Sequence, residues 1–493
     1  MKQFRYLIFF AAFCVFGLSS CDSFLNMEPS NSGNAETAIA TPADAKVVIN
    51  GIMRSMSSSD YYGRNFIMYG DAKGGDLTIY SAGRGLDALY SFNHTATSNS
   101  YSGFWVTGYY CIMQINNLLE NVGRLEADGK TGFSFYKGQA LTLRALIYFD
   151  LVRLYGLPYN YNKSSYGVPN VTKTLGADAQ PVRASVEENY TQIVDDLEEG
   201  MTLLASNKAA QNGYIGYYAN IALQARVKLY MEDYDGALAA AEEIIKNSSY
   251  KLYQPSAWVA SWSAQFGTES IFEIGVDTES DLGTSSLGFY LMRYAQKSGA
   301  QGWFLASDYF LSRLGQDASD VRWGIMDNDE YWYDTKNTRK GACYKYLGGT
   351  SLAGDGKETY TAVNIKVIRL SEVYLIAAEA ALHSKTPDAT LAAGYLNEIR
   401  KRSPQLALAT STTITDDMIL DERSKELFGE GQRFFDMIRK NKTIEFNDDF
   451  QGIPVSKREK TINRTFGKVV LPISQDEINA NPALRSEQNE AYK

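Results

Sequence analysis

The sequence predicts a mainly α-helical protein: a degenerate helical-repeat scaffold that carries long loop-rich insertions and a few short strands. Two observations lead to this fold class, a helix that is apolar on two faces and two later helix–turn–helix units rich in alanine. With 493 residues, of which 45% are hydrophobic and 21% charged, the chain can fill one large or two ordinary domains with a full core.

The segment 138–158 predicts a helix that is buried on two sides. Its apolar residues fall on two stripes at spacings of three and four, and a narrow polar seam with Arg144, Asp150 and Arg153 remains. Gly156 is expected to end the helix in a left-handed conformation, and a proline two residues later prevents the helix from resuming. A helix with two apolar faces belongs between two other helices, as in a stacked repeat.

Two further segments, 216–247 and 369–404, each contain a helix, a short turn and a second helix rich in alanine. The second helix of the pair that begins with 138–158 lies at 186–204, after a long loop. This plan resembles the tetratricopeptide repeat, whose helix pairs are about 34 residues long. The sequence therefore predicts an interrupted scaffold of helix pairs.

Residues 1–20 have the pattern of an export signal, with Lys2 and Arg5 ahead of an apolar run that is too short to span a bilayer as a mature helix. The run ends in Leu-Ser-Ser-Cys, which resembles a bacterial lipobox and predicts that Cys21 is lipidated. An ordinary secretory signal with a chance cysteine is the alternative. Acylation by more than one chain would anchor the protein stably, and the stretch 21–34 would be a tether.

The mature chain is divided into an N-terminal half, 35–250, and a C-terminal half, 251–493, which includes a loop-rich insertion at 251–364. The insertion lacks long helical periodicity and holds all but one of the six tryptophans. Aromatic residues in long loops on a rigid scaffold are typical of a recognition surface, although some must also form a small core under the loops. In the N-terminal half, Trp105 and Cys111 fall on apolar helical positions and are expected in the core.

Known catalytic motifs are missing from the sequence: there are two histidines, and no nucleophile elbow, phosphate loop, dinucleotide motif or H-E-x-x-H occurs. The acidic run with Asp327, Asp329 and Glu330 offers carboxylates for glycoside hydrolysis or for a structural calcium ion. Its spacing matches neither, so a solvated acidic loop is the simpler interpretation and no cofactor is predicted. The net charge of -9 argues against nucleic acid as a partner.

Charges of alternating sign follow one another along 421–440, DERSKELFGEGQRFFDMIRK. Glu422 and Glu426 lie one helical turn apart, and Glu430 lies three residues before Arg433. The pattern predicts a scaffold helix whose ion pairs are intrahelical.

Several motifs, taken in order along the chain, are similar to those of the SusD/RagB outer-membrane lipoproteins of Bacteroidota. The segment 143–156 (LRALIYFDLVRLYG) is the most recognisable of them. The other segments that carry the resemblance are 21–25 (CDSFL) with Pro29, Lys345-Tyr346, 368–379 (IRLSEVYLIAAE), 397–400 (NEIR), Glu422-Arg423, 430–433 (EGQR), 471–473 (LPI) and Asn481-Pro482. Together they cover nearly the whole mature chain, which makes the resemblance more specific than any one motif.

The resemblance implies a non-catalytic lipoprotein of the outer membrane, facing the cell exterior. Such a protein sits over a SusC-like TonB-dependent transporter and delivers captured oligosaccharide to it. The resemblance also implies a ligand surface formed by the early loops and the insertion, where Asp76, Arg84 and Tyr101 occupy the matching early positions. A peptide-binding member of the same family, a glycoside hydrolase and an assembly scaffold remain as alternatives.

Glycans present apolar C–H faces ringed by hydroxyl groups, so a site needs flat aromatic rings and a few polar side chains. The insertion supplies Trp303, Tyr331 and Trp332, and we expect the fold to bring some of these together with the early residues on one exposed face. Trp303 is the preferred anchor because Gln301-Gly302 before it allows the backbone to turn the ring outward. A few stacking contacts give weak binding, about micromolar to millimolar.

Overall fold

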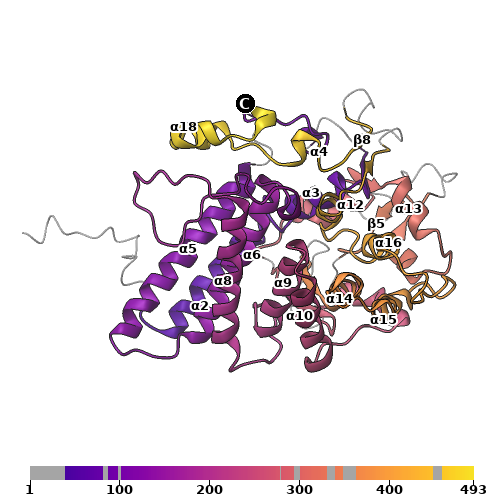
Figure 1. Ribbon diagram of the computed structural model, residues 1–493, viewed down its shortest axis with the longest axis horizontal. Coiled ribbons are helices and arrows are strands. Elements are labelled where there is room, and N and C mark those ends of the chain that lie inside the picture. The colour runs from indigo at the N-terminus through magenta and orange to yellow at the C-terminus, as the bar shows by residue number, and fades with distance from the viewer. Residues whose placement is uncertain are drawn as a thin grey trace, which may run out of the picture.

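The computed structural model describes residues 39–80, 87–97, 102–277, 279–293, 300–329, 339–347, 362–447 and 458–493. It is mainly helical, as the sequence predicts, and its long helices stack side by side (Figure 1). The scaffold helices are α2 (Pro42–Met56), α5 (Ser102–Ala127), α6 (Ser134–Tyr155), α8 (Val186–Leu204), α9 (Tyr217–Tyr230), α10 (Tyr234–Asn247), α14 (Leu370–His383) and α15 (Ala389–Arg400).

Shorter elements connect the scaffold helices. The described short helices are α3 (Asn65–Lys73), α4 (Asp87–Tyr90), α7 (Tyr159–Asn162), α11 (Pro255–Trp258), α12 (Leu287–Leu291), α13 (Asp308–Leu314), α16 (Asp416–Glu426), α17 (Arg433–Arg439) and α18 (Gln475–Ala480). The described strands form antiparallel pairs: β1 (Leu77–Ile79) with β3 (Phe304–Ala306), β2 (Ser270–Ile274) with β6 (Ile365–Arg369), β4 (Met326–Asp327) with β5 (Ala342–Cys343), and β7 (Ile444–Glu445) with β8 (Thr461–Ile462).

The three predicted helix pairs are all present, as α6 with α8, α9 with α10, and α14 with α15, and α10 packs on α14. The turn between α9 and α10 places Glu232 in the left-handed region at φ 61°. Asp233 and Asp388 then cap the second helices of their pairs by accepting hydrogen bonds from backbone N–H groups. Buried alanines such as Ala237 and Ala392 allow the paired helices to approach closely.

Helix α6 is buried all round from Gly138 to its end, and this includes its polar seam. Arg144 pairs with Asp196 of α8 at 2.6 Å, and Asp150 pairs with Arg153 at 2.5 Å. The guanidinium of Arg153 lies over the Phe149 ring, 4.1 Å from its centroid. The polar seam therefore meets internal partners rather than water, as a buried charge must.

Gly156 ends α6, but not in the predicted conformation. Its φ of -108° and ψ of 153° are extended rather than left-handed. A side chain there would meet Val186 Cγ2 at 2.9 Å and the Val152 carbonyl oxygen at 3.0 Å. The position thus favours glycine because the chain passes close to α8, and this corrects the expected left-handed cap.

The segment 421–440 is not one continuous helix. Helix α16 ends at Glu426 and α17 begins at Arg433, because Gly429 and Gly431 adopt φ values of 77° and 76° between them. Most of its ion pairs are long-range: Arg433 faces Asp76 at 3.4 Å, and Arg423 pairs with Asp436 at 2.7 Å. The predicted intrahelical pairing is therefore wrong for most of these residues.

Glu426 lies at the centre of a fully buried group of charges, here called the Glu426 cluster, which consists of Glu426, Arg322, Arg369 and Arg402. Its Oε1 accepts from Arg369 Nη1 at 3.0 Å, and its Oε2 lies 2.9 Å from Arg402 Nε and 3.3 Å from Arg322 Nη1. Burial raises the pKa of the Glu426 carboxyl, but the three guanidiniums outweigh burial and hold that pKa well below its usual range.

The Glu426 cluster fastens the insertion to the scaffold. Arg322 belongs to the insertion, Arg369 ends β6, and Arg402 follows α15. Trp258, another insertion residue, donates from Nε1 to Glu426 at 3.3 Å and is completely buried. Trp262 is 4% exposed, so these two insertion tryptophans belong to the core. Trp105 and Cys111 are also buried, as predicted.

Candidate functional site

The early segment and the insertion are joined by a pair of strands. Strand β1 pairs with β3 in the register Leu77 to Ala306 and Ile79 to Phe304. One residue beyond the pairing, the Tyr80 N–H donates to the Trp303 carbonyl oxygen at 2.7 Å. Segments more than 200 residues apart in sequence thus lie side by side.

Aromatic rings and guanidinium groups alternate at this place, which we call the junction and define as Arg64, Tyr80, Tyr290, Arg293 and Trp303. The Trp303 ring is half-buried and stands edge-on to Tyr290, with ring centroids 4.6 Å apart. The Arg64 guanidinium lies over Tyr290 at 4.5 Å, and that of Arg293 lies over Tyr80 at 4.2 Å. Partly exposed Tyr80 and Trp303 therefore rest on a buried layer that fixes them.

Gly302 turns the chain into Trp303. Its φ is 55°, in the left-handed region that favours glycine. A Cβ at this position would meet Arg293 Cδ at 2.4 Å, and the Gly302 carbonyl oxygen accepts from Arg293 Nη1 at 3.1 Å. Gly302 and Arg293 therefore set the position of Trp303 together.

Asp76 lies in the core directly before β1, at the opposite end of that strand from Tyr80. The side chain is completely buried, its Oδ1 pairs with Arg313 and lies 3.4 Å from Arg433 Nε, and its Oδ2 accepts from Ser424 Oγ at 2.7 Å. Both carboxylate oxygens thus have partners within the protein. This corrects the expectation that Asp76 contacts a ligand, since it instead holds β1 against α13 and α17.

Several expected residues fall outside the described part of the chain. These are Cys21, Arg84, Tyr101, Glu330, Tyr331 and Trp332. Asp329 is described and is fully buried, where it pairs with Arg339, so it does not belong to a solvated loop as expected. Among the described residues, no group of three or more metal-ligating side chains occurs.

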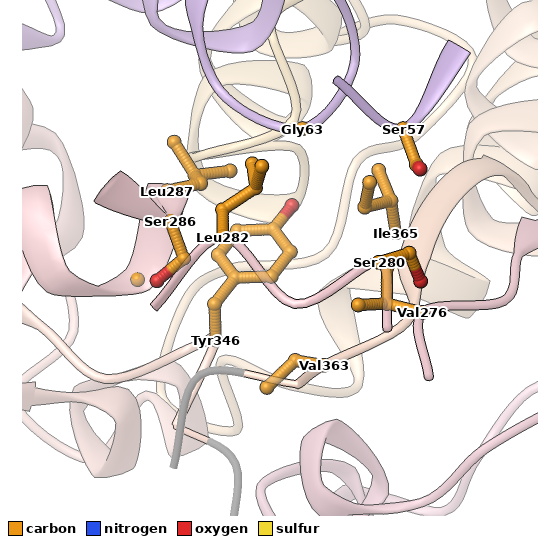
Figure 2. A pocket seen from close by; sticks show the side chains of 11 residues that line it. Ser57, Gly63, Val276, Ser280, Leu282, Ser286, Leu287, Tyr346, Val363 and Ile365 are labelled. Atoms are coloured by element: carbon orange, nitrogen blue, oxygen red, sulfur yellow. The ribbon is translucent and has the colours of Figure 1, made fainter. Parts of the chain in front are cut away.

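The small cavity in Figure 2 is not a ligand site. Leu282, Leu287, Val363 and Ile365 line it around the Tyr346 ring, and its volume is about 20 Å³. That volume holds a single water. The buried Ser286 hydroxyl, which has no hydrogen-bond partner within the described protein, is suited to bind that water.

A larger cleft of about 370 Å³ lies where the C-terminal segment crosses the end of α6 and the loop that follows it. Tyr161, Tyr166 and Arg464 line it. Sequence reasoning missed this cleft because its walls come from segments 300 residues apart. The one available signal was the stretch YNYNKSSY at 159–166, which is rich in the residue types that bind polar ligands.

The two cysteines of the described chain, Cys111 and Cys343, and one of its histidines, His94, are buried. Burial raises the pKa of the Cys111 thiol to about 12 and that of Cys343 to about 11, so both thiols stay protonated. Burial lowers the pKa of His94 to about 2, with Lys73 and Lys468 adding to the effect. His94 lies between Lys73 Nζ at 3.1 Å and the Tyr492 hydroxyl at 2.9 Å. No helix in the described chain has the length and hydropathy needed to cross a membrane.

Comparison with known proteins gives consistent matches over both halves of the chain. A family model described as SusD family matches residues 274–492, and one described as starch-binding associating with outer membrane matches 23–229. SusD-like protein P38 of Formosa agariphila is 25% identical over 96% of each chain. The starch-binding protein SusD of Bacteroides thetaiotaomicron is 32% identical, over 28% of this chain and 24% of that one.

Solved structures agree with these matches. A SusD superfamily protein from Bacteroides thetaiotaomicron is 33% identical and covers 91% of this chain and 100% of its own, with a TM-score of 0.81. A putative sugar binding protein from Bacteroides vulgatus is 31% identical and covers 93% of this chain and 100% of its own, also with a TM-score of 0.81.

Proposed function

Because this chain belongs to the SusD/RagB family, we propose that it is a surface-exposed, non-catalytic lipoprotein that binds glycans and hands them to a SusC-like TonB-dependent transporter. The ligand is an oligosaccharide or polysaccharide. The protein is held at the outer membrane through lipidated Cys21 and faces the cell exterior.

The junction is the observation that carries this proposal. Partly exposed Tyr80 and Trp303 come from the two segments that supply the expected ligand surface. The buried guanidinium of Arg293 lies over Tyr80, and that of Arg64 lies over Tyr290, which contacts Trp303. A sugar ring needs an aromatic face for its C–H groups and polar groups at its rim. The relative described as a putative sugar binding protein supports the same ligand class.

Membrane attachment follows from the leader sequence and not from the folded domain. Replacing Cys21 with alanine should leave a folded protein that is no longer retained on membranes, because the helices and strands of the described chain all lie beyond residue 38. The measurement is membrane fractionation in cells that lack the transporter. A Cys21→Ala protein that still pelleted with membranes would contradict the proposed anchor.

Binding measured against a panel of polysaccharides and peptide digests tests the ligand class. We expect saturable binding to at least one glycan, no comparable binding to peptides, and no release of reducing sugar. A peptide ligand with no glycan ligand would favour a peptide-binding member of the family instead. Product release that saturates with substrate and disappears in Asp329→Ala or Glu330→Ala would overturn the non-catalytic assignment.

A further inference from the structure

The cleft between the loop after α6 and the C-terminal segment is built on fixed backbone. The Leu471 N–H donates to the Leu154 carbonyl at 2.8 Å, and Asn489 Nδ2 donates to the Tyr155 carbonyl at 2.9 Å. Figure 1 shows this yellow C-terminal segment passing over the purple ends of α5 and α6. The cleft volume of about 370 Å³ falls within the roughly 300–1,000 Å³ of small-molecule sites.

Two tyrosine rings of the cleft are open to solvent. Tyr161 at the end of α7 is 44% exposed and Tyr166 is 46% exposed. Tyr166 is backed by the buried guanidinium of Arg183, whose Nε donates to the Gly167 carbonyl at 2.7 Å and whose Nη2 donates to the Tyr155 carbonyl at 2.8 Å. This ring therefore offers a flat, supported face for stacking.

Three polar side chains in the cleft are available to a ligand. The Arg464 guanidinium lies 4.9 Å from the centroid of the Tyr161 ring, and among the described residues no carboxylate lies within ion-pair distance of it. Asn162 and Ser164 line the same cleft, and their side chains make no hydrogen bond within the described chain. Arg464 thus provides a guanidinium with several N–H donors, Asn162 an amide and Ser164 a hydroxyl group.

The other charged groups at the cleft are already paired. Glu490, which also lines it, is bound to Lys493 at 2.5 Å, and the neighbouring Lys163 is bound to Glu187 at 2.5 Å. Arg464 is therefore the unpaired charge that faces the cleft among the described residues. A guanidinium in this setting binds a carboxylate through two parallel hydrogen bonds.

We propose that this cleft is a second sugar-binding site, selective for a carboxylate-bearing sugar such as a uronic acid unit of an oligosaccharide. Tyr166 stacks on the sugar ring, Arg464 binds its carboxylate, and Asn162 and Ser164 bind its hydroxyl groups. The inference rests on the proposed glycan-binding function and adds a site, separate from the junction, with its own charge preference.

The test uses saturation-transfer NMR and calorimetry on the mature chain, with D-glucuronate and D-galacturonate as probes and D-glucose and D-galactose as their neutral counterparts. We expect the uronates to bind at least tenfold more tightly than the neutral sugars, and Arg464→Gln to remove this preference. Tyr166→Ala should weaken both classes. The control is Lys468→Gln, which removes a nearby cation that does not line the cleft and should leave the preference intact.

Uronates that bind no more tightly than neutral sugars, or an Arg464→Gln protein that keeps the preference, would overturn the second site. A short peptide with a free terminal carboxylate that displaced the uronate at lower concentration would also overturn it. The Trp303→Ala variant distinguishes an incorrect second site from an incorrect glycan-binding function. If the second site alone is wrong, a neutral oligosaccharide still binds and depends on Trp303, whereas no glycan of either class binds if the glycan-binding function is wrong.

Discussion

Replacing Glu426 with glutamine removes one negative charge from the Glu426 cluster while it keeps the shape of the side chain. Three guanidiniums then share the space with fewer anions. The new amide group presents N–H donors toward Arg322 Nη1, which donates to Glu426, and toward the Arg402 guanidinium, which is ion-paired with it. Removing one partner from a buried ion pair costs about 3–5 kcal/mol, because the remaining charge is left uncompensated away from water.

This free energy predicts a measurable change in the melting temperature. At about 2.1 cal/mol/K per residue, the unfolding entropy of 493 residues is roughly 1 kcal/mol/K, so Glu426→Gln should lower Tm by about 3–5 °C. The assay is differential scanning calorimetry at pH 7. The matched control is Glu398→Gln, which breaks an exposed pair with Lys401 and should cost about 0–1 kcal/mol. Equal Tm shifts in the two variants would refute the structural role of the cluster.

Two further predictions concern charges in the core. Burial raises the pKa of Glu379, but Arg439 outweighs burial and holds this pKa below its ordinary value of 4.5; the same balance depresses that of Glu426. The stabilisation from these two carboxylates is complete above about pH 4.5 and is lost as the pH falls toward their pKa values in the folded protein. The Tm of the wild type should therefore decrease at pH values below about 4.5, and the decrease should be less steep in Glu426→Gln. A wild-type Tm that stayed constant down to pH 3 would contradict this. Burial lowers the pKa of Lys73, which pairs with no carboxylate among the described residues. The Lys73 amine therefore holds its proton more strongly in the unfolded chain than in the folded chain, and below about pH 10.5 this difference destabilises the fold. Lys73→Met should therefore raise Tm at pH 7 and raise it less as pH approaches 10.5, whereas a lower Tm at pH 7 would show that the amine stabilises the fold.

The helical scaffold was predictable because its signals are local. Two apolar stripes at 138–158 and the alanine-rich pairs at 216–247 and 369–404 each reflect one helix packing on its neighbours. Periodicity within a segment contains that information. The turn at Gly302 is equally local, since glycine adopts its φ of 55° without strain, but the turn alone does not decide whether the Trp303 ring faces solvent.

The features that sequence reasoning missed depend on distant partners. The charges of 421–440 suggested intrahelical pairs, but Arg433 meets Asp76 and Glu426 meets Arg402, and no spacing within one segment reveals such contacts. Asp76 was expected at the surface for the same reason, since its burial depends on Arg313. The cleft around Tyr161 and Arg464 likewise exists only once the C-terminal segment is folded over α6.

The central claim, that glycan binds at the junction, is tested most directly by isothermal titration of Trp303→Ala with an oligosaccharide that the wild type binds. We expect the affinity to fall about tenfold, since one stacking contact contributes about 0.5–1.5 kcal/mol beyond its buried area. The control is Tyr110→Ala, which removes a ring that is 53% exposed on α5 and should leave the affinity unchanged. Thermal melting of both variants shows whether Trp303 serves the core instead. A Trp303→Ala protein that binds with wild-type affinity would contradict the account.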